Sequence, residues 1–228
     1  MICKTPTFTL AVLFVASIFL VALTPAAEAH VGLLRPCARG SPRAGCPAPS
    51  NGQRVDYDLN SPIGTRGSRD SPICKQSIPN ANRPVYKAGE TINTQYSVGA
   101  SHGGGHCQWA LSYDNGKTWV VVKTMLRDCL KGISGGAAYS VPVKIPSTAP
   151  SGKAIFMWLW NNAIGNRELY SNCADIEIKG VKGGSITGPQ ALIANYGSDS
   201  ALIPEFGSGG RDDGSAAFNT RKTITVRA

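Results

Sequence analysis

The sequence predicts an all-β fold, an antiparallel β-sandwich of the immunoglobulin or fibronectin type III kind, with long loops and disulfide bonds. Three observations lead to this prediction. Several short stretches alternate apolar and polar residues, turns rich in Pro and Gly divide them, and no stretch keeps a helical period. The length of 228 residues fits one domain of ordinary size with a tail.

The predicted strands begin only after a long irregular segment. Residues 31–73 are rich in Pro, Gly, Ser and Arg and show little periodicity, so we expect loops there. Beyond Gly89 the alternation is clear, and Asn115-Gly116 marks a tight hairpin turn because both residues tolerate positive φ. The predicted strands are 92–98, 107–113, 119–122, 139–145, 154–161 and 174–178.

The two ends of the chain differ from the middle. Residues 1–29 have the basic start, apolar run and Ala27-Glu28-Ala29 cleavage site of a signal peptide, so we expect a secreted, extracellular protein without a membrane anchor. Residues 30–206 form the predicted domain, in which 191–194 is apolar enough to pack back. Residues 207–228 read as a Gly/Ser-rich tail, whose end, 222–228, is either a last strand or disordered.

Six cysteines remain once residues 1–29 are removed. An even number in a secreted chain indicates three disulfides, for which fifteen connectivities exist. Cys37 and Cys46 close a short loop and are the natural local pair. The residues alone leave the other pairings open, and no CxxC spacing suggests a zinc ribbon.

The net charge of +9 narrows the class of partner. No block of Lys and Arg and no interleaving of basic and aromatic residues is present, so we do not expect a nucleic-acid partner. The charge fits solubility or attraction to an anionic wall surface.

The scarcity of histidine points to a metal site at the mature N-terminus. The chain has only His30, His102 and His106. Cleavage after Ala29 would give His30 a free α-amine beside its ring Nδ1, and a second His would complete a planar set of three nitrogens, which suits Cu(II). His102 precedes three glycines in a loop, where backbone shapes a surface site. We expect His106 to lie on the surface and not to be a ligand, because its neighbour Cys107 faces inward.

Three motifs together resemble a known family. They are His30 after cleavage, His102-Gly103-Gly104-Gly105 leading into Cys107-Gln108, and Gly165-Asn166-Arg167-Glu168-Leu169-Tyr170-Ser171-Asn172-Cys173-Ala174. In these three motifs the chain resembles the fungal lytic polysaccharide monooxygenases of auxiliary activity family eleven. The resemblance runs from His30 to about Phe206 and is weakest over residues 31–72.

The resemblance implies a role for each motif residue. His30 and His102 match the copper ligands, the arrangement called a histidine brace. Tyr170 matches the axial aromatic residue, and Glu168 matches an acid that orients the oxygen species. Ala100 matches a small residue near the open axial position. The resemblance also implies the disulfides Cys74–Cys173 and Cys107–Cys129, whereas Cys37–Cys46 has no counterpart in it.

The activity implied by the resemblance is copper-dependent oxidative cleavage of an insoluble polysaccharide, with chitin as the substrate. An external reductant and O2 or H2O2 would act with a monomeric enzyme. Two alternatives remain: a copper-binding protein without polysaccharide-cleaving activity, and cleavage of another wall polysaccharide such as cellulose. A metal-free carbohydrate-binding sandwich is less favoured, because such surfaces use exposed aromatics and we expect Trp109, Trp119, Trp158 and Trp160 in the core.

Overall fold

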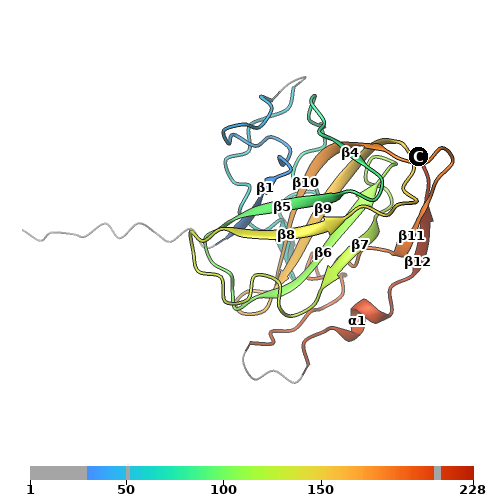
Figure 1. Ribbon diagram of the computed structural model, residues 1–228. Helices are drawn as coiled ribbons and strands as arrows, with labels where there is room; N and C mark the ends of the chain where they lie inside the picture. Colours follow the sequence, from blue (N-terminus) through green and yellow to red (C-terminus); the bar gives the residue numbers. More distant parts are fainter. Residues whose placement is uncertain (1–29, 50–51, 208–211) are drawn as a thin grey trace, which may run out of the picture.

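The structure, a computed structural model, describes residues 30–49, 52–207 and 212–228, and the expected signal peptide lies outside them. Two β-sheets face each other, with long loops at their edges (Figure 1). The predicted all-β sandwich is therefore confirmed. In the part of the chain that the structure describes, no helix has the length and apolar character needed to span a membrane.

The smaller sheet carries the beginning of the described chain. Its order is β1 (Val31–Arg35), β5 (Thr91–Val98) and β8 (Tyr139–Lys144), and all pairs are antiparallel. In β5, Ile92, Thr94, Tyr96 and Val98 are buried and the residues between them are mostly exposed. This alternation is the pattern predicted for a half-buried strand. β1 is a strand that the sequence analysis missed, because it lies in the segment expected to be irregular.

The larger sheet has the order β3-β2-β10-β9-β6-β7. Its strands are β2 (Gly64–Thr65), β3 (Ser68–Arg69), β6 (Gly105–Ser112), β7 (Val120–Met125), β9 (Gly152–Asn162) and β10 (Glu168–Lys179). A further short strand, β4 (Val85–Lys87), pairs with β10 in parallel and is an exception to the antiparallel pattern. The strand predicted at 174–178 is the second half of β10, which begins six residues earlier, at Glu168.

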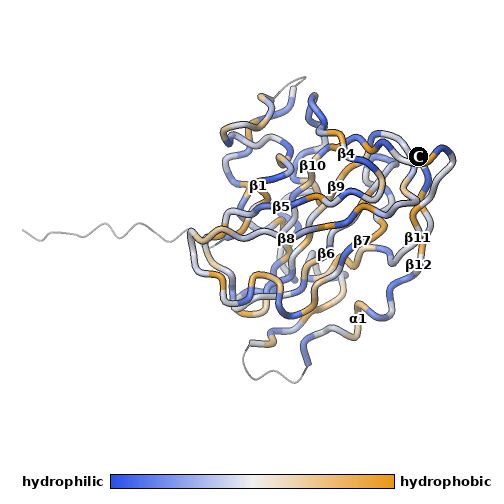
Figure 2. The backbone as a smooth tube through the Cα atoms, viewed as in Figure 1, coloured by the Kyte–Doolittle hydropathy of each residue, from blue (hydrophilic) through white to orange (hydrophobic). Residues whose placement is uncertain are grey.

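Both faces of the larger sheet are covered. One face packs against the smaller sheet, where Trp109, Trp158 and Tyr170 meet residues such as Val31 and Val141. The other face is covered by Ile63 and by the partly buried side chains of 73–74, 191, 193 and 196. All four tryptophans are buried, as predicted. Figure 2 shows apolar segments where strands cross the middle of the molecule and polar segments over many outer loops.

The last described residues belong to the folded body. β11 (Ile186–Pro189) and β12 (Thr223–Val226) form a two-stranded antiparallel sheet, and α1 (Ala216–Asn219) is one short helix. Phe218 and Val226 are buried in the hydrophobic clusters. Of the two possibilities left open for 222–228, the structure therefore has the strand.

The described residues form three disulfides, and their pairs are those expected: Cys37–Cys46, Cys74–Cys173 and Cys107–Cys129. The first closes a loop, and the other two each tie a loop to a strand of the larger sheet. Cys173 lies in β10, so the second bridge fastens the irregular N-terminal segment to the larger sheet. The backbone N–H of Arg39 adds a hydrogen bond of 2.8 Å to the carbonyl of Cys173. This segment is thus held against β10 beside the candidate residues Glu168 and Tyr170.

Candidate metal centre

His30 is held in place by the residues that follow it. Val31 pairs with Val98 in the β1–β5 register, and the N–H of Gly99 donates a 2.7 Å hydrogen bond to the carbonyl of His30. The N–H of Val31 donates to the carbonyl of Asn60 at 3.1 Å. Strand pairing therefore places His30 beside the loop that continues from β5 into Ala100 and His102.

The His102 loop has a conformation that depends on glycine. His102 itself has a positive φ of 45°, and Gly103 follows with a φ of 70°. Glycine adopts this positive φ without strain, and a Cβ at Gly103 would lie 2.6 Å from the Cδ1 of the exposed Ile164 side chain, which would have to shift. The N–H of Ile164 donates to the carbonyl of His102 at 3.0 Å. The His102 loop therefore packs against the residues that follow β9.

Glu168 and Tyr170 project from the same face of β10, since they are two residues apart. Tyr170 is fully buried and Glu168 is nearly so. The Tyr170 hydroxyl donates to Glu168 Oε2 at 2.9 Å and lies 3.5 Å from His102 Nε2. The Tyr170 ring centroid lies 6.1 Å from that of His30 and 6.4 Å from that of His102. One buried phenol therefore brings all four candidate residues together.

Burial, and next the charge of Glu168, raise the pKa of Tyr170 well above its usual value. The phenol therefore stays protonated across the physiological range and offers its neighbours a neutral oxygen. A neutral hydroxyl would be at most a weak ligand for a metal held nearby, whereas a charged phenolate would bind a cation strongly.

The donor set near Tyr170 fits a nitrogen-bound metal. Among residues 30–49, 52–207 and 212–228, no three His, Cys, Asp or Glu side chains form a group that could hold a metal ion. Two imidazoles, those of His30 and His102, lie near the phenol, with ring centroids 6.1 and 6.4 Å from its own. The third nitrogen would be the α-amine that the expected cleavage after Ala29 would expose. Amine and imidazole nitrogens are donors that Cu(II) prefers.

His106 is not where the sequence analysis expected it. It is 1% exposed, and its ring packs against those of Phe206 and Phe218, with centroid distances of 4.6 and 5.0 Å. Its Nδ1 accepts a hydrogen bond from the N–H of Arg127 at 3.1 Å, so Nε2 donates to the carbonyl of Asp213 at 2.7 Å. The prediction of a surface residue was wrong because the C-terminal segment covers this face of β6.

Two neighbours of the centre were missed from the sequence. Asn162 donates a hydrogen bond from Nδ2 to Glu168 Oε2 at 2.8 Å. The ring of Trp160 packs against that of Tyr170, with their centroids 4.5 Å apart. Trp160 was expected only as a core residue. The alternation of Trp158, Trp160 and Asn162 along one strand places all three on the same face as the site, which was the available signal.

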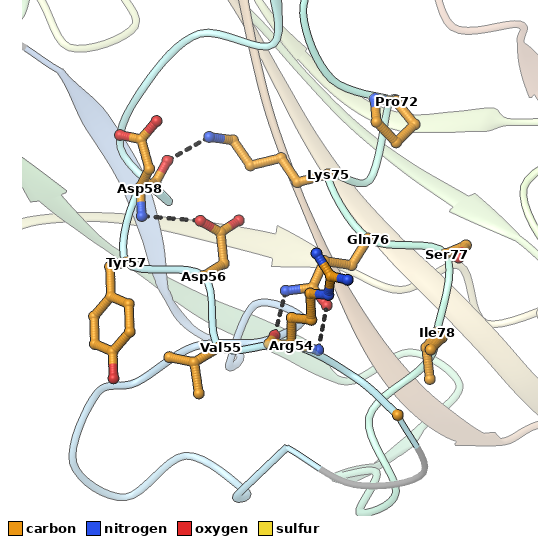
Figure 3. A pocket seen from close by; sticks show the side chains of 11 residues that line it. Arg54, Val55, Asp56, Tyr57, Asp58, Pro72, Lys75, Gln76, Ser77 and Ile78 are labelled. Atoms are coloured by element: carbon orange, nitrogen blue, oxygen red, sulfur yellow. Dashed lines mark hydrogen bonds between the residues drawn. The ribbon is translucent and has the colours of Figure 1, made fainter.

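A pocket of about 510 Å³ lies in the irregular segment, and neither candidate histidine lines it (Figure 3). Lys75 points across it and donates to the carbonyl of Asp58, and Gln76 bonds to the backbone of Arg54. Tyr57, which also lines this pocket, is 86% exposed. It is an exposed aromatic residue that the sequence analysis did not single out.

Comparison with known proteins gives the family. The chain is 38% identical over 156 residues to the AA11 family lytic polysaccharide monooxygenase A of Aspergillus fumigatus, a match that covers 65% of this chain and 68% of the relative. The chain belongs to the AA11 family of lytic polysaccharide monooxygenases. Members of the AA11 family are copper-dependent oxidoreductases, so the expected enzyme class is confirmed.

Two further AA11 relatives are more distant. The AA11 monooxygenase B of Aspergillus fumigatus is 35% identical over 52% of this chain, and an AA11 monooxygenase of Aspergillus oryzae is 33% identical over 53%. Each match spans about a third (32%) of the relative's length. No family model matches the chain. Among solved structures, a cellulose-active polysaccharide monooxygenase from M. thermophila has a TM-score of 0.44 and 18% identity, over 72% of this chain and 79% of that chain.

Proposed function

We propose that this AA11 chain is a secreted monooxygenase that cleaves chitin oxidatively at a copper centre formed by His30 and His102. The observation that carries the proposal is the arrangement around Tyr170. Its hydroxyl lies 3.5 Å from His102 Nε2 and 2.9 Å from Glu168, and its ring lies 6.1 Å from that of His30. Two imidazoles near one neutral phenol favour a metal centre over a hydrolytic pair of carboxylates.

The residues that would hold copper are the α-amine and ring of His30 and the ring of His102, with the Tyr170 hydroxyl close to them. When bound, copper supplies the one-electron chemistry with which O2 or H2O2 oxidises a C–H bond beside the glycosidic link. The proposed enzyme is a monomer, and an external reductant supplies its electrons. The protein contributes the position of the ligands and the electrostatics around them.

Glu168 is the group suited to hold or move a proton in this site. Its Oε2 accepts hydrogen bonds from the Tyr170 hydroxyl and the Asn162 amide. Its Oε1 has no partner among the described residues and is not among their unsatisfied buried atoms. One oxygen is therefore fixed by the protein while the other remains accessible. A carboxyl group held in this way can take up a proton on its free oxygen and pass it to a reacting group.

Copper binding tests the centre. Protein that begins at His30 is titrated with Cu(II) and followed by calorimetry and electron paramagnetic resonance. We expect tight one-to-one binding with a nitrogen-rich spectrum, lost in His102→Ala and in a chain with one residue added before His30. Ser101→Ala, which changes the neighbouring residue, is the control and should bind normally. Equal binding by all four proteins would refute the proposed ligands.

Activity separates the enzyme from a copper carrier. The copper-loaded protein is incubated with chitin or cellulose, ascorbate and O2 or H2O2, and the soluble products are analysed by mass spectrometry. Oxidised chitin oligosaccharides support the proposal, and oxidised products from cellulose alone would replace chitin by cellulose. Tight copper binding without oxidised products from either polymer would identify a copper-binding protein. Chitin binding that a chelator leaves unchanged would favour the metal-free sandwich.

Secretion is tested at the N-terminus. Sequencing of the protein from the culture medium of an expressing fungal host should give His30 as the first residue. A protein retained in the cell, or one that starts elsewhere, would contradict the proposed cleavage after Ala29.

A further inference from the structure

A cavity of about 430 Å³ lies at the side of β10, between the loop after β1 and the residues before β4. It is separate from the candidate metal centre, since neither candidate histidine lines it. Its walls include Pro36, Pro47, Pro84 and the half-buried ring of Tyr86. Arg35 and Arg83 also line it. The cavity thus combines apolar surfaces with two guanidinium groups.

The charge of Arg83 is not cancelled by its carboxylate neighbour. Asp175 is fully buried, and Arg39 binds it with two hydrogen bonds, Nε to Oδ2 at 2.9 Å and Nη2 to Oδ1 at 2.8 Å. The N–H of Asn80 also donates to Oδ2 at 2.8 Å. Arg83 reaches the shared Oδ1 with Nη1 alone, at 3.3 Å. Two arginines therefore share one carboxylate, which leaves one positive charge in excess.

Arg35 adds a second positive charge. Its Nη1 donates to the carbonyl of Leu34 and its Nη2 to the carbonyl of Ala44, each at 2.8 Å. These acceptors are neutral. Within the described residues no carboxylate lies within 4.0 Å of the Arg35 guanidinium. The cavity therefore carries an excess of two positive charges.

The positions of these groups are fixed before any ligand binds. The Cys37–Cys46 disulfide closes the loop whose Ala44 carbonyl holds Arg35, and Arg35 Nη1 also lies 3.2 Å from the Sγ of Cys46. Asp175 anchors Arg83 to β10. A site whose charged groups are already ordered loses less conformational entropy when it binds a ligand.

We propose that this cavity binds a small organic anion, a carboxylate carried on a six-membered ring. Guanidinium groups pair with carboxylates through parallel hydrogen bonds, and the N–H groups of Arg83 other than Nη1 have no acceptor among the described residues. Proline and tyrosine walls favour a ring over a bare inorganic anion, and the volume is typical of small-molecule sites. The ring acid is either a uronic acid unit of a polysaccharide or a free phenolic acid. This inference does not depend on the copper site.

The test uses calorimetry or NMR titration of the full mature protein with D-glucuronate and with 4-hydroxybenzoate. Glucose, 4-hydroxybenzamide and inorganic phosphate are the matched probes. We expect saturable binding of at least one ring acid that weakens with salt, and at least about tenfold weaker binding by the neutral probes and phosphate. Binding of glucuronate points to an acidic polysaccharide, and binding of 4-hydroxybenzoate alone points to a phenolic acid.

Matched variants locate the binding. Arg83→Gln removes one of the two excess charges but leaves the Arg39–Asp175 pair, so it should fold and should bind the ring acid at least about tenfold more weakly. Arg54→Gln removes one charge from an exposed arginine of the other pocket and should bind normally. The proposal is overturned if neither acid binds at millimolar concentration, if the neutral probes or phosphate bind as well, or if the two variants behave alike.

Discussion

Tyr170 is the residue around which the candidate centre is arranged, and its hydroxyl depends on Glu168. Burial first, and then the negative charge of Glu168, raise the pKa of the phenol. Glu168→Gln removes the charge but keeps the size, so the pKa of Tyr170 should fall while remaining above its usual value. The measurement is a pH titration of metal-free protein with labelled tyrosine, followed by NMR.

Glu177→Gln is the control for this substitution, because Glu177 lies nine residues further along the same strand. It should leave the titration of Tyr170 unchanged. If Glu168→Gln has no larger effect than Glu177→Gln, the carboxylate does not influence the phenol as the 2.9 Å contact implies.

The buried ring of His106 should make the stability of the protein depend on pH. Burial lowers its pKa below the usual value of about 6.5. The unfolded chain therefore binds the proton more readily, so the stabilisation present above about pH 6.5 is lost as the pH falls toward the lower pKa of the folded state. Between about pH 7.5 and pH 5, the wild type should lose more free energy of unfolding than His106→Gln. The difference is about 1.4 kcal/mol for each unit by which the pKa is lowered.

The groups that face His106 do not obscure this measurement. Arg127 stays charged throughout. Burial alone would raise the pKa of Asp213, but hydrogen bonds from Ser215 and from the Arg127 guanidinium outweigh it and lower this pKa to about 2. Asp213 therefore also stays charged between about pH 7.5 and pH 5. Urea unfolding at each pH gives both free energies. Parallel curves for the wild type and the variant would contradict the prediction.

At the scale of elements, periodicity identified strands that have one solvent-exposed face. β5 alternates clearly and was predicted almost to the residue. β6 and β10 are buried on both faces, so alternation says little about which side chain meets solvent. This is why β10 was found only in part and His106 was placed on the surface. β1 was missed because a five-residue strand gives too little periodicity within a Pro- and Gly-rich segment.

The candidate centre was more accessible to sequence analysis than its surroundings. His30, His102, Glu168 and Tyr170 are few, chemically distinctive, and part of recognisable motifs, and the structure brings them together. Asn162 and Trp160 have no such signal, since their roles arise from the pairing of β9 with β10. Such contacts depend on strand register, which one sequence does not specify.

The C-terminal segment supports the sandwich, and its removal should be costly. A chain ending at Gly207 loses the buried side chains of Phe218 and Val226 and the cover over His106. Burial of two such side chains contributes roughly 3–6 kcal/mol, so the truncated chain should unfold at clearly lower urea concentration. Phe218→Ala tests the same contact within the full chain, with exposed Val85→Ala as its control. Unchanged stability of the truncated chain would show that the segment is dispensable.

At the scale of the whole molecule, the disulfides differ in what they restrain. Cys74–Cys173 spans 99 residues, whereas Cys107–Cys129 spans 22. Loop-closure entropy gives about 5 kcal/mol for the first and about 3 kcal/mol for the second. Replacing both cysteines of the long bridge by serine should therefore destabilise the protein more than the same change in the short one. Chemical denaturation of the two double variants measures the difference.

Hydrogen exchange adds a spatial test of the same bridge. Without Cys74–Cys173, protection should fall first in residues 52–78, because this segment has few strands of its own. Loss of protection spread evenly over both sheets would mean that the bridge stabilises the molecule globally and does not hold one segment.

The two ends of the described chain lie on different sides of the molecule. β1, which follows His30, begins at the left of Figure 1, and Ala228 lies at the right, just beyond β12. An anchoring group attached at Ala228 would therefore leave the histidine face turned outward. The protein lends itself to immobilisation on an electrode or bead through its C-terminus, with the candidate copper centre presented to a solid substrate.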